Sequence, residues 1–220
     1  MNFNGAVGLA PPTSSGEHLY RFELVSRDST LSPAESPEPA LAVGARAAGT
    51  FDPKARRLYA DQIELSGGVG QALGTLAVDF APGKAPGLAL ALSANDMPLA
   101  HLKQIWPWFS AQPARRWVLG SVFGGTVVDS RVVLRVPPGR LGNGVPLNGE
   151  EVFGTATLQG TRFDVAGQIP PVRDARGTVS FRGPDVDLDL ESGTIYLPSG
   201  RTVAGRDGIL TIRDANKRPV

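Results

Sequence analysis

The sequence predicts a mainly β fold, an antiparallel meander interrupted near its middle by a short, broken helical insertion. Three observations carry this prediction. Apolar and polar residues alternate with a period of two through most of the 220 residues, turn-forming pairs separate these runs, and one segment near the middle follows helical spacing instead. That segment contains all three tryptophans of an otherwise aromatic-poor chain.

The alternation is clear at 20–24, where Tyr20, Phe22 and Leu24 are interleaved with Arg21 and Glu23. Each such run has one apolar and one polar face. This pattern is typical of antiparallel strands, whereas parallel strands covered by helices read as continuous apolar runs. The same pattern recurs at 75–80, 88–93, 131–136, 162–165, 179–182 and 185–191.

Turn signals punctuate these strands. The 27 glycines and 19 prolines are read as turn residues, for example at Asn143-Gly144 and Asp207-Gly208. A Gly-Thr pair is expected to open successive strands, with the glycine in a tight turn at positive φ. These pairs begin at Gly49, Gly74, Gly125, Gly154, Gly177 and Gly193. The stretch STLSPAESPEPA at 29–40 is predicted to be a long, mobile loop between the first two strands.

The helical insertion is predicted over 95–124. Asn95 or Asp96 would cap a first helix, with Pro98 in its first turn, and Pro107 would break it at Trp106. A second helix would begin near Pro113 and stop at Gly124-Gly125. The chain then divides into a first meander at 1–94, the insertion at 95–124 and a second meander at 125–220, which together form one continuous domain.

Composition excludes some function classes. The 22 Lys and Arg residues against 21 Asp and Glu residues give a net charge of +1, which leaves no basic excess for nucleic-acid binding. The absence of cysteine excludes disulfides and thiolate chemistry. No apolar run approaches the roughly 20 residues of a membrane span, and the start lacks a signal-peptide pattern. We expect the chain to be an excised part of a longer protein.

No catalytic constellation stands out, so we expect neither an enzyme nor a cofactor. His18 and His101 lie far apart without metal-ligand spacing, and the glycines of GGVGQALG precede a strand and not a helix. The run from Asp185 to Glu191 places carboxylates on one strand face about 7 Å apart. We interpret it as a solvated outer face and not as an ion site.

The run from Asp96 to Thr202 resembles the AsmA-like domain of YhdP-type bacterial envelope proteins, in the wider AsmA/TamB superfamily. The similarity rests on Trp106-Pro107, on Ala114-Arg115-Arg116-Trp117, on Gly124-Gly125-Thr126 and on the Gly-x-Val-x-Phe-x-Gly step at 177–183. It covers about half of the chain well and the first half more loosely. The expected N-terminal membrane anchor is missing from this sequence.

The resemblance implies a periplasmic envelope protein that is anchored in the inner membrane in its full-length form. It also implies an open, strongly curved sheet whose apolar groove binds phospholipid or another acyl-chain lipid and conducts it towards the outer membrane. Transfer of a lipid chain from water to such a groove is favourable by about 0.8 kcal/mol per CH₂, and no catalytic residue is needed.

The alternation and the resemblance together predict the residues of the groove. The expected lining is Leu76, Val78, Phe80, Leu88, Leu90, Leu92, Val132, Leu134, Val136, Phe163, Val165, Val179, Phe181, Val186, Leu188 and Leu190. Trp106, Trp108 and Trp117 are expected to plug the end of the sheet from the broken helices. Arg115 and Arg116 would be the polar side of the second helix or would contact anionic headgroups.

Two other functions remain open at this point. The same strands could form a structural spacer or interaction domain with a closed core, and the tryptophans could serve as sugar platforms. Whether the apolar face is open or covered distinguishes the lipid groove from the structural spacer. An open trough favours lipid binding, whereas a second sheet packed on the same residues would give a sandwich.

Overall fold

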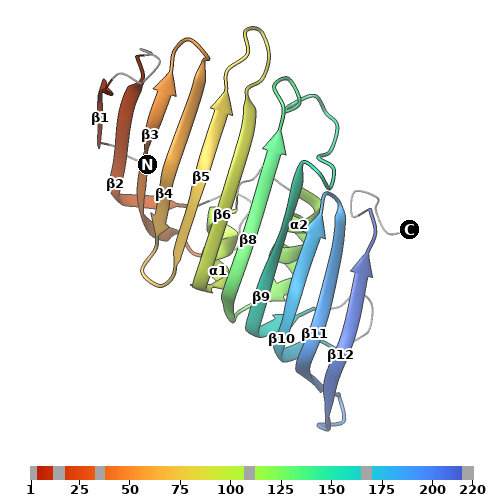
Figure 1. Cartoon of the computed structure of the whole chain (residues 1–220). Helices are drawn as coiled ribbons and strands as arrows, with labels where there is room; N and C mark the ends of the chain where they lie inside the picture. The colour runs from red at the N-terminus through yellow and green to blue at the C-terminus, as the bar shows by residue number, and fades with distance from the viewer. Residues whose placement is uncertain (1–3, 12–17, 33–37, 107–111, 165–169, 215–220) are drawn as a thin grey trace.

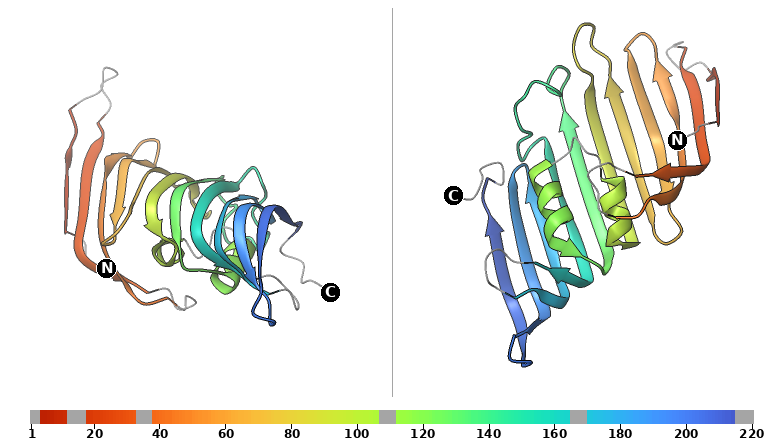
Figure 2. Two further views of the ribbon diagram at one scale, coloured as in Figure 1. Left: turned by 90° about the horizontal axis from the view of Figure 1, so that it is seen from below. Right: turned by 180° about the vertical axis from the view of Figure 1, so that it is seen from behind.

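The computed structural model describes residues 4–11, 18–32, 38–106, 112–164 and 170–214. Within these residues, twelve strands form one antiparallel sheet that does not close on itself, and two short helices lie on one side of it (Figures 1 and 2). Each strand pairs with the next along the chain, apart from the short β7, which pairs with β9 beside the main path. The predicted mainly β meander with a helical insertion is therefore confirmed.

The strands are long and the connections between them are mostly short. The first meander contains β1 (Asn4–Leu9), β2 (Tyr20–Leu31), β3 (Leu41–Asp52), β4 (Arg57–Ser66), β5 (Gln71–Asp79) and β6 (Gly87–Pro98). The insertion contains α1 (Leu99–Ile105), α2 (Gln112–Ser121) and β7 (Val122–Phe123). The second meander contains β8 (Thr126–Val136), β9 (Val152–Phe163), β10 (Val172–Arg182), β11 (Asp185–Tyr196) and β12 (Thr202–Ile212).

The register aligns most of the apolar residues of these strands on one side, which we call the inner face. Directly paired residues point to the same side of a sheet, so rows of partners can be followed across it. One row consists of Val7, Phe22, Gly49, Ala60, Leu76, Leu90, Leu134 and Val152. The opposite side, the outer face, carries rows such as Arg21, Thr50, Tyr59, Ala77, Ala89 and Arg135.

Glycines lie inside the strands on the inner face, which corrects the prediction that Gly-Thr pairs mark turns. Gly125 does precede β8 at positive φ. Gly74, Gly154 and Gly177, in contrast, lie within β5, β9 and β10. A Cβ at Gly154 would lie 2.8 Å from Cζ of Phe181 and 2.6 Å from the Arg131 carbonyl oxygen. The glycines thus leave room where the bend of the strands, visible in Figure 2, crowds the inner side.

The first helix begins later than the sequence predicts, whereas the second begins at Gln112, next to the predicted start near Pro113. Asn95 and Asp96 belong to β6, where Asn95 pairs with Asp129 and Asp96 has a φ of 48°. The predicted cap was therefore wrong, because strand pairing continues through it. Pro98 is the N-cap of α1 and makes no side-chain capping hydrogen bond. The helix ends at Trp106, whose ψ of 118° is extended, as expected for a residue before proline.

The helices cover the middle and the second half of the inner face, from parts of β5 and β6 onwards, and leave most of the first meander uncovered. Figure 2 (right) shows α1 and α2 over the strands around β6 to β10. The main buried cluster lies beneath them and includes Leu99, Val122, Leu134, Leu158 and Val186, each at most 3% exposed. In the described part of the chain, no second sheet packs on the inner face.

The first hairpin, β2 with β3, bends towards the helices. A register shift between Ser26 and Ser29 interrupts the pairing, and beyond it the two strands run across to α1 (Figure 2, right). Leu41 and Val43, at the start of β3, are 8% and 3% exposed. The predicted loop at 29–40 is therefore shorter than expected, since β2 extends to Leu31.

Candidate functional site

The predicted lining residues of the first meander lie on the inner face, as the alternation indicates. Leu76, Leu88, Leu90 and Leu92 are half-buried there, and Val78 is buried. Phe80 follows the end of β5 and is 47% exposed, with its ring edge-on to Phe51 at 6.4 Å between centroids. This half of the predicted lining is a partly open apolar surface.

The predicted lining residues of the second meander lie beneath the helices. These side chains form the floor of a covered core and not an open trough. Val132 and Leu190 are half-buried, and the others are buried: Leu134, Val136, Phe163, Val179, Phe181, Val186 and Leu188. Val165 lies outside the described residues.

Two of the three predicted plug residues pack on this core. Trp106 at the end of α1 stacks on Phe181, with 5.8 Å between ring centroids and 29° between the planes. Trp117 on α2 packs against the same cluster and borders a second hollow near Phe163 and Leu190. Trp108 lies outside the described residues.

Four exposed apolar side chains of the inner face were not in the predicted lining. Val7 and Leu9 on β1 are 70% and 67% exposed, and Tyr20 and Leu24 on β2 are 40% and 37% exposed. The alternation at 20–24 signalled this face of β2. The small residues of β1 gave no comparable signal, because NGAVGL carries no polar partner for its apolar positions.

A cavity of about 80 Å³ lies between the helices and the sheet. Its walls include Leu102 and Trp106 of α1, Val118 of α2, and Leu92 and Val179 of the sheet. No charged side chain lines it among the described residues; its polar lining is limited to Ser93, Ser130 and Thr155. The Ser130 hydroxyl already donates to the Ala94 carbonyl at 3.2 Å. Such a cavity suits hydrocarbon better than water.

Arg115, in contrast to Arg116, differs from its predicted role. Arg116 is exposed on α2, as a polar helix face requires. Arg115 is only 3% exposed and is therefore not available at the surface for headgroups. The neighbouring residues Val118 and Leu119 are also buried, so α2 is packed over more of its surface than the sequence indicates.

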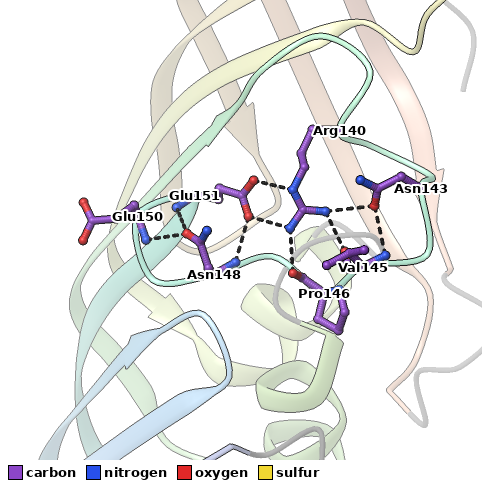
Figure 3. A network of polar contacts seen from close by, with 7 residues as sticks. All are labelled: Arg140, Asn143, Val145, Pro146, Asn148, Glu150 and Glu151. Atoms are coloured by element: carbon purple, nitrogen blue, oxygen red, sulfur yellow. Dashed lines mark hydrogen bonds and ion pairs between the residues drawn. The ribbon is translucent and has the colours of Figure 1, made fainter.

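The loop between β8 and β9 closes one end of the covered core. Arg140 Nη2 donates to Glu151 Oε2 at 2.8 Å, and Arg140 also donates to the carbonyl oxygens of Val145 and Pro146 (Figure 3). Leu141 and Leu147 from the same loop pack against the core cluster.

Glu151 is the acidic centre of this network and is 8% exposed. Burial alone would raise its pKa. Hydrogen bonds from the Arg140 side chain and the Asn148 backbone N–H, together with the Arg140 charge, outweigh that effect and lower the pKa below its ordinary value.

Two of the carboxylates between Asp185 and Glu191 make hydrogen bonds with the end of the last strand. Asp187 accepts hydrogen bonds from Thr211 of β12 and from Arg213 just after it, and Asp185 accepts one from the Asp214 backbone N–H. Among the residues that the structure describes, no three histidine or carboxylate side chains gather closely enough to hold a metal ion. Within the same residues, no helix is long and apolar enough to cross a membrane.

Comparisons with protein-family models, with curated proteins and with solved structures found no match to this chain. The inner face is therefore interpreted from its own geometry. It offers a half-open apolar surface over β1 to β6 that adjoins a covered apolar core over β6 to β11. Such an arrangement can bind hydrocarbon without any fixed polar partner.

Proposed function

We propose that this chain binds phospholipid or another acyl-chain lipid along its inner face and conducts it through a bacterial cell envelope. In this proposal, the chain is the periplasmic part of a longer protein that is anchored in the inner membrane and supports outer-membrane integrity. The resemblance to AsmA-like domains suggested this function, and a sheet with one continuous apolar face is consistent with it.

The observation that carries the proposal is the exposure of apolar side chains over the first strands. No other described residue covers an apolar patch that includes Val7, Leu9, Tyr20 and Leu24. Extended apolar patches on a protein surface mark sites of interaction with lipid, ligand or protein. Burying an acyl chain here contributes about 0.8 kcal/mol per CH₂.

The spacer alternative also has an observation in its favour. The core beneath α1 and α2 is closed by the helices and by the β8–β9 loop, as a structural domain requires. The difference between the two functions therefore depends on the half of the inner face that β1 to β6 form.

Photocrosslinking tests the proposal directly. A photoreactive side chain would replace Leu76 on the inner face or, as the matched control, Ala77 on the outer face of the same strand. We expect lipid adducts at Leu76 and none at Ala77, together with phospholipid in native mass spectra of the gently extracted protein. Equal labelling at both positions, or no lipid in either measurement, would remove the basis of the proposed function and favour the spacer.

A further inference from the structure

The cavity beneath α1 is too small for a whole lipid chain, although its chemistry suits one. Its volume of about 80 Å³ corresponds to room for a few water-sized groups, enclosed by side chains such as Leu102, Trp106 and Val179. A longer hydrocarbon needs more room than this cavity offers, and a movement of α1 away from the sheet would provide it. The contacts that hold α1 therefore decide whether the cavity is accessible.

The first hairpin holds α1 through polar contacts on residues that do not line the cavity. Lys103 Nζ lies 3.0 Å from Glu38 Oε1, and the Lys103 side chain is fully buried. Gln104 Nε2 donates to the carbonyl oxygens of Glu38 and Pro39 at 2.8 and 2.7 Å. Lys103 Nζ also lies 4.7 Å from the centre of the Phe123 ring. We call the Lys103–Glu38 and Gln104–Pro39 contacts the α1 latch.

Besides these polar contacts, α1 is held by apolar packing of Leu99, Leu102 and Ile105 and not by its own helical stability. It is seven residues long and has no side-chain cap at Pro98. Isolated helices of this length are unstable in water, so its position depends on tertiary contacts. The Leu99 backbone N–H donates to the Gly125 carbonyl at 3.1 Å, which ties the first turn of α1 to the start of β8. The second half of α1 is held by the α1 latch together with the packing of Ile105 and the stack of Trp106 on Phe181.

We propose that α1 is a displaceable cover over a binding site for one unbranched acyl chain. This inference rests on the proposed function. A chain that reaches the open half of the inner face inserts its end beneath α1 when the α1 latch separates. Because no charged group of the described residues lines the cavity, the polar headgroup stays outside it, on the open half. The α1 latch also links the two halves of the inner face, because Glu38 precedes β3 in the open half and Lys103 lies on α1.

The charge of the α1 latch provides a selective test. Glu38→Gln leaves the buried Lys103 without its carboxylate, which favours states in which Lys103 reaches water. Adding Lys103→Met removes the buried charge as well, so in the double variant α1 should again lie against the sheet. Glu23→Gln is the matched control, because Glu23 belongs to the same hairpin and pairs with Arg46 at 2.9 Å on the outer face.

Access to the cavity can be measured because the chain has no cysteine of its own. A single Val179→Cys substitution places a thiol in the cavity wall. We expect an apolar thiol reagent to label it roughly tenfold faster in the Glu38→Gln background, which corresponds to a shift of about 1.4 kcal/mol. Labelling should return to the original rate in the double variant and be unchanged by Glu23→Gln. Equal rates in all four backgrounds would overturn the role of the latch.

Palmitic acid with a photoreactive group at the end of its chain identifies the ligand class. We expect it to crosslink to Val118 and to peptides of β10, with a higher yield in Glu38→Gln. Crosslinks confined to the open half, around Leu24 and Leu76, would overturn the covered site and leave the proposed function intact. The absence of crosslinks anywhere on the inner face would overturn both.

Discussion

The indole of Trp106 stacks on the ring of Phe181, at 5.8 Å between centroids, and joins the end of α1 to the C-terminal end of β10. The two residues are 75 positions apart in the sequence, as 181 minus 106 gives. The tryptophan-rich segment is thus a structural element of the covered core, and its contact partner is a residue that the alternation predicted on the inner face.

Trp106→Ala should destabilise the covered core by about 2–4 kcal/mol, because it removes a large, partly buried ring and its aromatic contact. Urea unfolding followed by far-ultraviolet circular dichroism measures the change. Trp106→Phe is the control. Because it keeps an aromatic ring at this position, it should lose less than half as much unfolding free energy as Trp106→Ala. A loss below about 0.5 kcal/mol in Trp106→Ala would mean that the stack contributes little to the fold.

An aspartate should have different effects in the two halves of the inner face. Leu134 is 1% exposed, so Leu134→Asp buries a carboxylate without a partner and should unfold the domain. Leu24 is 37% exposed, so Leu24→Asp should leave the fold within about 1 kcal/mol of the parent while it weakens lipid crosslinking. Thermal unfolding and crosslinking on the same samples test both statements. Unfolding of Leu24→Asp would show that the first half is a closed core after all.

Gly154→Ala tests whether strand glycines make room for the bend of the sheet. The added methyl group would meet the Phe181 ring, and the substitution should cost about 1–3 kcal/mol in unfolding free energy. Gly8→Ala in β1 is the matched control, since no atom of the described residues lies within 4 Å of the added Cβ. The interpretation fails if both substitutions have the same effect in chemical denaturation.

The Arg140–Glu151 network should loosen in acid. Because the folded state lowers the pKa of Glu151, the stabilisation is complete above the unfolded pKa of about 4.3 and is lost as the pH falls through the lower folded value. Nuclear magnetic resonance of the Asn148 and Val145 amides between pH 6 and 3 follows the change locally. Glu151→Gln should abolish this pH dependence. If Glu151→Gln shows the same acid transition as the parent, the transition belongs to another group.

The antiparallel meander could be predicted from the sequence because its signals are local. Alternation within a strand depends on neighbouring residues, and the register then aligns the strands. The Gly-Thr pairs were misread because glycine has two uses in this chain. Gly125 adopts a positive φ in a tight turn, whereas Gly154 leaves room on a crowded inner face. Composition does not distinguish these two uses.

The candidate site could be predicted only in part because its cover depends on long-range contacts. Alternation places Leu90 and Leu134 on one face but does not reveal that α1 and α2 lie above that face. Neither the buried Arg115 nor the Lys103–Glu38 pair carries a local signal, since each depends on segments brought together by folding. The predicted caps Asn95 and Asp96 failed for the same reason, because β8 extends the pairing of β6.

The order of the strands has a consequence for how this chain folds. Each strand of the main path contacts the strands next to it in sequence, as in a repeat protein whose stability is a sum of neighbour terms. Such a sheet can grow one hairpin at a time and fray from either edge without general collapse. The bend of the first hairpin onto α1 breaks this linear scheme, since it joins segments about 65 residues apart. Completion of that one contact, and not the pairing of the last strand, is the step that should make folding cooperative across the middle of the sheet.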